Sequence, residues 1–346
     1  MTSMRVARVM GSRDIRLGDA PVPVPGPGEA LVRIKAVGIC GSDLHYYTHG
    51  RIGDVRFTPG HILGHEVAGV VEALGPATPG PTPGTPVAVD PAIHCGTCRF
   101  CVEGHPNLCR QLRFFGSPPT PGALREFLTH PAHLLYPLPP EIVQPVGATI
   151  EPLGVAIHAV DLGHLTLGAS VAVFGCGPVG LMVAAVAQLA GSRIVCAVEP
   201  LAHRRKVASQ FGAAVAFDPA ADDVVRSIRD RTDGDGVDVA FEVSGSSSAT
   251  AQAVQVVRPG GTLVLAGYWD ADEVTLPGIT AMRKGLTIRF VRRMKHTFPR
   301  AIDLVRRDQV SLSALVTHKF ALAQVAEAFA RADRRSPDII KAVVLL

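Results

Sequence analysis

The sequence predicts a two-domain α/β protein in which a mostly-β domain is followed by a doubly wound parallel sheet. Three observations support this fold class. The chain has 346 residues, which is long for a single hydrophobic core. Strand-like runs joined by loops dominate the first 150 residues. Beyond residue 170, short apolar runs alternate with helical segments, as in a parallel sheet covered by helices.

The first domain is expected to be built around an antiparallel sheet. Alternating β-branched and polar residues predict strands at 4–9, 30–38, 65–74 and 86–90. The proline-rich segment 21–28 can form neither a helix nor a central strand, and the segment 76–86 predicts a stiff surface loop. Functional residues of such a domain are expected in its connections.

The second domain is expected to alternate strands and helices. Buried strands are predicted at 171–174, 194–198, 215–217, 237–243, 263–266 and 286–291. Helices are predicted at 178–190, 201–211, 222–231 and 248–257. From about residue 300 the chain has helical periodicity again, and a last strand is predicted at 340–346.

Composition excludes several classes of protein. The net charge is +4, and the basic residues are dispersed apart from a local arginine cluster near residue 290, so nucleic-acid binding has no support. No run of about 18 apolar residues is present, which argues against a membrane protein. The first ten residues alternate like a strand and lack the apolar core of a signal peptide. Four of the seven cysteines crowd into one short segment with a spacing that suits a metal better than disulfides, and reduced thiolates lead us to expect a cytoplasmic protein.

A nucleotide site is predicted where the first strand of the second domain meets its helix. Gly175, Gly177 and Gly180 form a G-x-G-x-x-G motif, with Pro178 and Val179 between the second and third glycines. The glycines let the backbone approach a pyrophosphate, whose charge is stabilised by the helix N-terminus. The motif alone is common by chance, but its place between a predicted strand and a predicted helix is the context that this mechanism needs.

Glu199 lies at the end of the next predicted strand. An acidic side chain there accepts hydrogen bonds from the ribose hydroxyls and repels a 2′-phosphate, so NAD is favoured over NADP. The alternative is a glutamate that only caps the following helix.

Four of the seven cysteines lie close together in the sequence. Cys95, Cys98, Cys101 and Cys109 have the spacing C-x₂-C-x₂-C-x₇-C. Four thiolates on a short loop can surround one Zn²⁺ and leave no open position, which defines a structural site. An iron–sulfur cluster or two disulfides are the alternatives.

A second, open metal site is predicted from the segment 40–66. Cys40, His65 and Glu66 offer a thiolate, an imidazole and a carboxylate, the donor types of a catalytic zinc. A lone cysteine or histidine is more often a packing or hydrogen-bonded residue, so the combination carries the prediction. Asp43 is expected to orient His65, because metal-bound imidazoles usually donate their second N–H.

These motifs together resemble those of the zinc-dependent medium-chain alcohol and polyol dehydrogenases, and the resemblance extends over nearly the whole chain. It implies a GroES-like catalytic domain at 1–152 and 294–346 and a Rossmann NAD-binding domain at 153–293. It also implies two zinc ions per subunit, one catalytic and one structural, and favours zinc as the ion that the four cysteines bind.

The resemblance further implies roles for individual residues. Glu151 stands where the simple-alcohol dehydrogenases carry a second zinc-binding cysteine, and a glutamate there is characteristic of the sorbitol, xylitol and glucose dehydrogenase branch. Which of Glu66 and Glu151 binds the resting metal is left open. Ser42 and His45 match a relay that carries the substrate proton toward solvent, although an exposed loop histidine can also be only solvated.

The remaining expected contacts concern the cofactor and the substrate. Arg204 matches a residue that stacks near the adenine, and Ala266, Gly267 and Arg293 match further cofactor contacts. Tyr46 and Arg293 match substrate-binding residues, whereas Met294 stands where a tyrosine is usual.

The predicted activity is hydride transfer from a secondary hydroxyl of a sorbitol- or xylitol-like polyol to NAD, giving a ketose. The alternatives are a 2,3-butanediol, threonine or simple secondary-alcohol dehydrogenase, or an inactive protein that binds zinc and nucleotide. A homotetramer is expected, with a dimer as the alternative.

Overall fold

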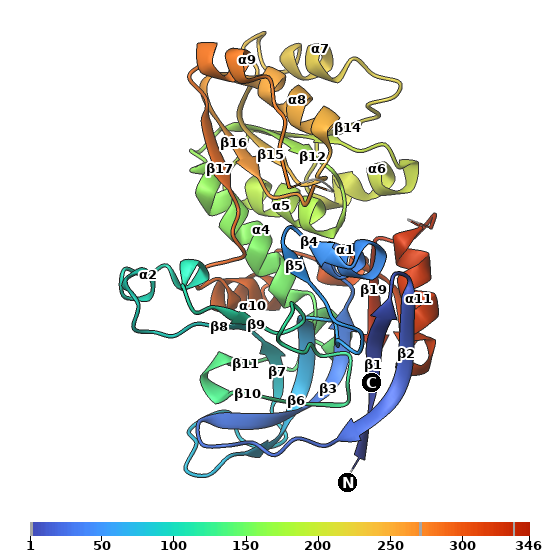
Figure 1. Ribbon diagram of the computed structural model, residues 1–346. Helices are drawn as coiled ribbons and strands as arrows, with labels where there is room; N and C mark the ends of the chain where they lie inside the picture. The colour runs from blue at the N-terminus through green and yellow to red at the C-terminus, as the bar shows by residue number, and fades with distance from the viewer. Residues whose placement is uncertain (1–2, 270–271, 335) are drawn as a thin grey trace. The chain divides into compact units, whose positions relative to one another are not determined.

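The structure is a computed structural model that describes residues 3–269, 272–334 and 336–346. The chain forms two compact units (Figure 1). Unit 1 comprises the residues up to Glu151 together with Phe298–Arg307 and Leu312–Leu346, and unit 2 comprises Pro152–Thr297 and Asp308–Ser311. Among the described residues, no helix is long and apolar enough to cross a membrane.

Unit 1 is organised around a mainly antiparallel sheet with a hydrophobic core. The strand order is β11 (Leu135–Pro137), β7 (Pro86–Val89), β6 (Glu66–Leu74), β3 (Glu29–Gly38), β19 (Lys341–Leu345) and β18 (Val316–Ala321), and β10 (Phe127–Pro131) also pairs with β3. Two-stranded ribbons are formed by β1 (Ser3–Gly11) with β2 (Asp14–Pro21), β4 (Arg51–Ile52) with β5 (Val55–Arg56), and β8 (Ala92–Ile93) with β9 (Arg113–Phe114). Its helices are α1 (Gly41–His49), α2 (Arg99–Val102), α3 (Gln144–Gly147), α10 (Phe298–Arg306) and α11 (Val325–Asp333).

The end of the chain lies in the middle of this sheet. Strand β19 pairs antiparallel with β3, with Val344 opposite Val37 and Val343 opposite Gly38. Both valines of the first pair are fully buried. This pairing places the residues that begin β19 beside the segment that leads from β3 into α1, so a residue near position 340 can reach Cys40.

Unit 2 is a six-stranded parallel sheet. The strand order is β14 (Val215–Phe217), β13 (Ile194–Val198), β12 (Ser170–Phe174), β15 (Val237–Glu242), β16 (Val257–Leu265) and β17 (Thr287–Phe290). Its helices are α4 (Ile150–Gly163, which begins in unit 1), α5 (Pro178–Leu189), α6 (Ala202–Ala208), α7 (Val224–Arg229), α8 (Ser247–Val256) and α9 (Gly278–Arg283). Figure 1 shows α5 on one side of the sheet and α8 on the other. The predicted doubly wound sheet is confirmed.

The direction of winding reverses at β12, which pairs with β13 on one side and with β15 on the other. Ligands of such sheets bind at this switch point, beyond the carboxyl ends of the strands. The glycine motif follows β12 directly, so the sheet order places it at the expected nucleotide site.

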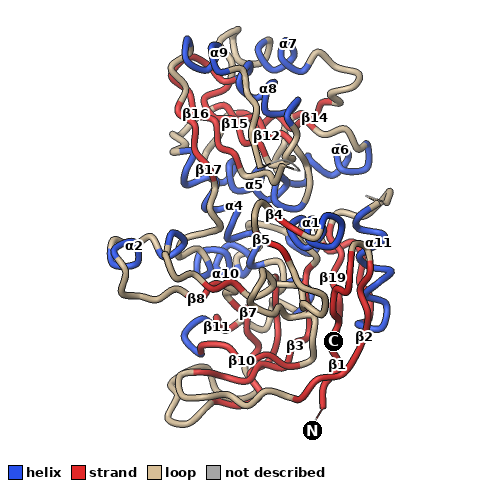
Figure 2. Tube along the Cα trace, in the orientation of Figure 1, coloured by secondary structure: helices blue, strands red, loops and turns tan. Residues whose placement is uncertain are grey.

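The structure corrects several predicted elements. Strand β16 begins at Val257, earlier than the strand predicted at 263–266, and replaces the last residue of the helix predicted at 248–257. Helices α1 and α4 and strands β2 and β18 were not predicted (Figure 2). Strand β18 interrupts the region after residue 300 that was expected to be helical. Its exposed residues alternate with less exposed ones, but the less exposed positions are Val316, His318 and Phe320, so a histidine interrupts the apolar period that prediction depends on.

Candidate active site and metal centres

The open donor set predicted from the sequence comes together in unit 1. One donor atom each of Cys40, His65 and Glu66 lies within 4.8 Å of the other two. Cys40 is the residue before α1, and His65 and Glu66 stand at the start of β6. His65 and Glu66 are 5% and 1% exposed, so the donors are held inside the unit. A thiolate, an imidazole and a carboxylate in this arrangement suit Zn²⁺ with room for a further ligand.

Two glycines make the donor arrangement possible. Gly64 has a φ of +91°, and a side chain there would approach Val37 to 2.7 Å. A Cβ at Gly38 would overlap the carboxylate of Glu66. The Gly-His-Glu turn and the glycine that ends β3 therefore leave space for the imidazole and the carboxylate to face Cys40.

Asp43 fixes the geometry of this site, as its place in the sequence suggested. Its carboxylate accepts hydrogen bonds from the backbone N–H of Cys40 and of Gly64, each at 3.0 Å, and lies 3.4 Å from Nδ1 of His65. Asp43 is 1% exposed. Burial alone would raise the pKa of Asp43, but His65 and the two N–H donors keep this pKa below its usual value.

The same contact acts on His65. Burial lowers the pKa of a histidine, but the charge of Asp43 and the neighbouring Cys40 raise the pKa of His65 well above its usual value. Because Asp43 faces Nδ1, the other ring nitrogen, Nε2, is the one available as a metal ligand.

Helix α1 carries three further predicted site residues, Ser42, His45 and Tyr46. Ser42 and His45 are half-buried, and the rings of His45 and His49 lie 5.6 Å apart. Tyr46 is buried, and its hydroxyl lies 3.0 Å from Oγ of Ser117. Sequence reasoning missed Ser117, because a serine in the loop after β9 carries no motif.

An aromatic ring lines the open site. The rings of His65 and Phe114 lie 5.0 Å apart, and Phe114 ends β9, three residues before Ser117. The segment from Phe114 to Ser117 therefore brings an apolar ring to His65 and a hydroxyl group to Tyr46. Such a combination can orient a small polar molecule.

The other residues predicted for substrate or metal lie outside this donor group. Glu151, in the first turn of α4, is 5% exposed and does not belong to the group formed by Cys40, His65 and Glu66. Arg293 adopts a left-handed φ of 55° in unit 2. Met294 is buried and packs against Gly154, so it contributes to packing inside unit 2. The metal role of Glu151 and the ligand roles of Arg293 stay predictions.

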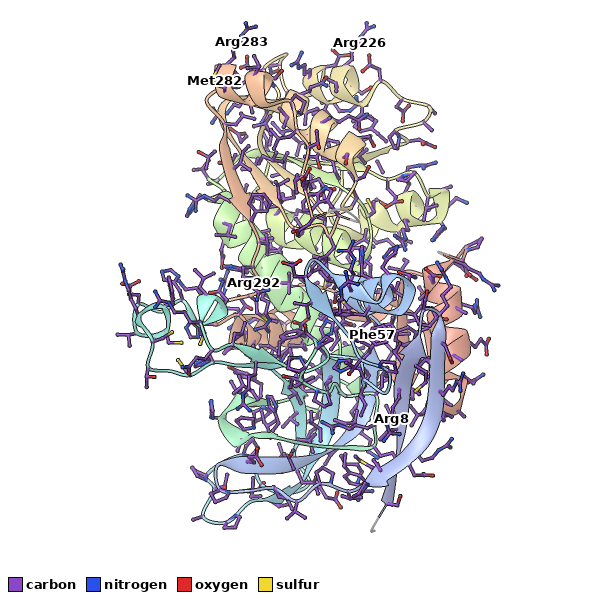
Figure 3. All side chains as sticks on the ribbon, viewed as in Figure 1. Arg8, Phe57, Arg226, Met282, Arg283 and Arg292 are labelled. Atoms are coloured by element: carbon purple, nitrogen blue, oxygen red, sulfur yellow. The ribbon has the colours of Figure 1, made fainter. Side chains whose placement is uncertain are left out.

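The four cysteines form the second metal centre. Their sulfur atoms lie 3.5–4.0 Å apart in the pairs Cys95–Cys109, Cys98–Cys101, Cys98–Cys109 and Cys95–Cys101. Sulfurs about 2.3 Å from one tetrahedral zinc lie about 3.8 Å apart, so the cluster matches a single closed ion. All four are free thiols, which argues against the two disulfides. Figure 3 shows yellow sulfur atoms gathered beside α2.

Backbone donors prepare this lobe for thiolates. The N–H groups of Cys98, Cys95 and Gln111 each lie 3.3 Å from a cysteine sulfur. Hydrogen bonds from the backbone of Thr97 and Cys98 lower the pKa of Cys95 to about 6. The loop therefore favours at least one ionised sulfur before any metal binds.

Cys101→Ser should release the structural metal and leave the catalytic metal in place. Removing one of four ligands opens the tetrahedron, and structural zinc contributes directly to folding free energy. We expect metal analysis to fall from two zinc ions to one per chain and the melting temperature to fall with it. A wild-type protein with at most one zinc per chain and full activity would contradict the assignment of one of the two sets.

The glycine motif has the backbone geometry that a pyrophosphate site requires. Gly175 has a φ of +99°, and a Cβ at Gly180 would lie 1.8 Å from the carbonyl oxygen of Gly175. Helix α5 begins at Pro178, with Gly177 as the preceding residue and Val179 in its first turn. The N–H groups of this turn are free to face an anion.

Glu199 is anchored beside this motif. Its carboxylate accepts hydrogen bonds from the N–H of Cys176 at 2.7 Å and from that of Leu201 at 2.9 Å. The guanidinium of Arg204 would lie 3.6 Å from a side chain at Gly177. Arg205 is held by Asp218 at 2.8 Å and by the carbonyl oxygen of Glu199. Glu199 is thus held directly after β13, beside the glycine motif, and its contact with a ribose stays a prediction.

Sequence reasoning also missed Glu242, which ends β15 at the switch-point side of the sheet. Its carboxylate accepts hydrogen bonds from the N–H of Ser244 and Gly245, and its carbonyl oxygen accepts those of Ala266 and Gly267. Burial raises the pKa of Glu242. The two predicted cofactor contacts, Ala266 and Gly267, are therefore fixed to the end of β15.

Comparisons with known proteins agree with this geometry. Residues 26–140 match the family model of the alcohol dehydrogenase GroES-like domain, and residues 178–307 match that of the zinc-binding dehydrogenases. The chain is 36% identical to the sorbitol dehydrogenase of Bacillus subtilis (strain 168) over 344 residues, covering 99% of this chain and 97% of the relative. It is 37% identical to the probable D-xylulose reductase A of Emericella nidulans over 313 residues, which cover 89% of this chain and 87% of the relative.

A solved structure extends the likeness to the whole fold. A zinc-binding dehydrogenase of Sinorhizobium meliloti 1021, bound to NADP, has a TM-score of 0.90 and 30% identity, and the match covers 100% of both chains. The chain belongs to the zinc-binding medium-chain alcohol dehydrogenase family. It is a zinc-binding, NAD(P)-dependent dehydrogenase with a Cys₄ cluster and a Cys/His/Glu site, and the expectation of an enzyme is confirmed.

Proposed function

We propose that this enzyme oxidises a secondary hydroxyl of a polyol to a ketone with NAD as the hydride acceptor. The donor group of Cys40, His65 and Glu66, which leaves a metal position open, is the observation that carries the proposal. A bound Zn²⁺ supplies a Lewis acid that stabilises an alkoxide at neutral pH. Glu151 is proposed as a further carboxylate at this metal, either directly or through water.

The chain's own residues would position the substrate and remove its proton. Tyr46 and Ser117 offer two adjacent hydroxyl groups, which can bind the hydroxyls of a polyol that do not react. Ser42 would accept the proton of the reacting hydroxyl, and His45 would pass it toward solvent. The half-buried position of both residues on α1 is compatible with such a relay.

A polyol is favoured over a simple alcohol for a chemical reason. A carboxylate in place of a second thiolate makes the metal environment harder and more polar, which suits a second hydroxyl near the metal. The sorbitol and xylulose names of the relatives point the same way. A 2,3-butanediol, threonine or simple secondary-alcohol dehydrogenase is the runner-up.

The test of the proposal is NADH formation, followed at 340 nm, with the purified protein and a panel of polyols, diols and simple alcohols. Sorbitol or xylitol should give the fastest reaction, and a zinc chelator should stop it. Zinc-bound protein that reduces no cofactor with any alcohol would favour an inactive nucleotide- and zinc-binding protein.

NAD is proposed as the cofactor, and Glu199 as the residue that selects it. Glu199→Ala should raise the relative use of NADP, because it removes both ribose hydrogen bonds and the repulsion of a 2′-phosphate. Losing such charge-assisted hydrogen bonds weakens NAD binding by about 10- to 100-fold. The ratio of kcat/KM for NAD and NADP measures the effect. A wild-type enzyme that prefers NADP would refute this assignment.

A homo-oligomer is proposed, and a tetramer is the expected state. Strand β17 lies at the edge of the parallel sheet, and its Phe290 is 61% exposed. On the neighbouring helix α9, Ile279 and Met282 are 62% and 69% exposed, and Figure 3 shows Met282 projecting from its helix. An exposed edge strand with apolar side chains is a suitable surface for pairing with a second copy. Light scattering on the purified protein determines the state.

A cytoplasmic location is proposed for the same protein. All seven cysteines are free thiols, and the Cys₄ site requires reduced sulfur. Fractionation of cells that express the protein tests the location.

A further inference from the structure

Lys341 makes a contact at the candidate catalytic metal site that no motif predicts. It is the first residue of β19 and is 3% exposed. Its ammonium group donates a hydrogen bond to Oε1 of Glu66 at 2.5 Å and another to the carbonyl oxygen of Ile39 at 2.9 Å, and it also contacts Oε2 of Glu66. Lys341 therefore touches one donor of the metal site and the residue next to another, Cys40.

Glu66 is enclosed on the side away from the metal. Its side chain is 1% exposed, and Gly38 packs so closely against the carboxylate that any side chain at position 38 would overlap it. Both carboxylate oxygens face Lys341, while one of them also belongs to the donor group with Cys40 and His65. The carboxylate is thus held between an ammonium group and the place of the metal.

The charges around this carboxylate have a direct consequence. A buried carboxylate needs a compensating charge, and Lys341 supplies one whether or not a metal is bound. A zinc ion at Cys40, His65 and Glu66 would share Glu66 with this ammonium group. The zinc would also be repelled by the positive charge of Lys341, in an interior that screens charges poorly.

We propose that Lys341 is a positioning residue that weakens the bond of Glu66 to the catalytic zinc and so keeps Glu66 an exchangeable ligand. The inference rests on the proposed function, because it takes the open donor set as the catalytic zinc site. The proposal has a consequence that is unusual for a residue beside a metal site, because removing Lys341 should make the site bind zinc more tightly. A merely structural tie between β19 and the Cys40 segment predicts the opposite, a looser site.

The experiment follows zinc release from the full-length, zinc-loaded protein into the chelator 4-(2-pyridylazo)resorcinol. Lys341→Met should slow the release of the catalytic zinc by at least about tenfold, the lower end of the effect that neighbours of metal ligands have on affinity. Lys341→Arg keeps the charge and should release zinc at close to the wild-type rate. Lys319→Met removes an exposed lysine from the adjacent strand β18 and should change nothing.

The structural zinc serves as the internal reference. Its release phase, identified by its loss in Cys101→Ser, should have the same rate in every Lys341 variant. The Glu66→Gln background separates the two effects of Lys341. In this background Lys341→Met should still slow zinc release, because the repulsion between the ammonium group and the zinc is gone. The factor should be smaller than in the wild type, because there is no Glu66 carboxylate for Lys341 and the zinc to share.

The outcomes decide between the ideas. Equal or faster zinc release from Lys341→Met, with two zinc ions in the wild type, overturns the role of Lys341 and leaves the proposed function intact. A wild type whose only zinc disappears in Cys101→Ser overturns the proposed function instead. If Lys341→Met does not fold, the test compares Glu66→Gln with the double variant Glu66→Gln/Lys341→Met, which contains no unpaired charge. Slower zinc release from the double variant than from Glu66→Gln supports the proposal. Equal or faster release overturns it.

Discussion

Sorbitol or xylitol should be oxidised with a kcat/KM about a thousandfold or more above that of ethanol or 1-butanol. A site that hydrogen-bonds a substrate hydroxyl rejects an analogue without it, because the polar groups of the site are then left unpaired. In the structure the hydroxyls of Tyr46 and Ser117 lie 3.0 Å apart, and Ser117 follows Phe114, whose ring packs against His65, by three residues. Ethanol offers these groups no second hydroxyl.

Glu151 variants test the origin of this preference. Glu151→Ala should abolish most turnover of the polyol, because the proposed carboxylate at the metal is lost. Glu151→Cys is the matched variant: it restores the thiolate that simple-alcohol dehydrogenases carry there, so it should keep the zinc and reduce the polyol-to-ethanol ratio. Kinetics with both substrates and zinc analysis of each variant provide the measurements.

Tyr46→Phe provides a narrower probe, since it removes one hydroxyl and keeps the buried ring. The expected loss is roughly tenfold in kcat/KM for the polyol, the value of about one hydrogen bond, with little change for ethanol. If ethanol proves as good a substrate as any polyol for the wild-type enzyme, the interpretation of Glu151 fails.

The predicted parts of the fold are those with strong local signals. The glycine motif follows β12 as expected, because residues 171–174 form a continuous buried apolar run and the turn after it requires glycine. The Cys₄ lobe was also predictable, since all its ligands lie within one loop and their spacing alone restricts the geometry.

The missed helices have identifiable reasons. Helix α4 is mostly apolar and buries most of its residues, so it has only a weak amphipathic period of the kind on which sequence prediction depends. Helix α1 is short and rich in polar and aromatic residues, and its N-terminus is defined by Asp43, whose carboxylate bonds the backbone of Cys40.

The contact between Lys341 and Glu66 could not be predicted from the sequence alone. The two residues are 275 positions apart, and only the pairing of β19 with β3 brings them together. Ser117 is a similar case, because its partner Tyr46 lies 71 positions away and neither residue stands in a spacing pattern. Such contacts depend on strand order, which local periodicity does not specify.

Asp43→Ala should lower the affinity of the open site for zinc by about 10- to 100-fold, the usual effect of losing the partner of a metal-bound histidine. Asp43 joins three parts of the site, since it bonds the N–H of Cys40, the N–H of Gly64 and the ring of His65. Its removal also leaves two N–H groups without their acceptor, at a cost of about 1–3 kcal/mol each in the free energy of unfolding. Zinc content after dialysis against a chelator and urea unfolding measure the two effects.

One further variant separates the effect of charge from that of shape at Asp43, and a second variant serves as the control. Asp43→Asn keeps the size and one acceptor oxygen but not the charge, so it should lose less stability than Asp43→Ala while still weakening zinc binding. Asp54→Ala removes an exposed aspartate from the turn between β4 and β5 and should behave as the wild type. Zinc held by Asp43→Asn as tightly as by the wild type would show that His65 is oriented by the shape of this turn and not by the carboxylate charge.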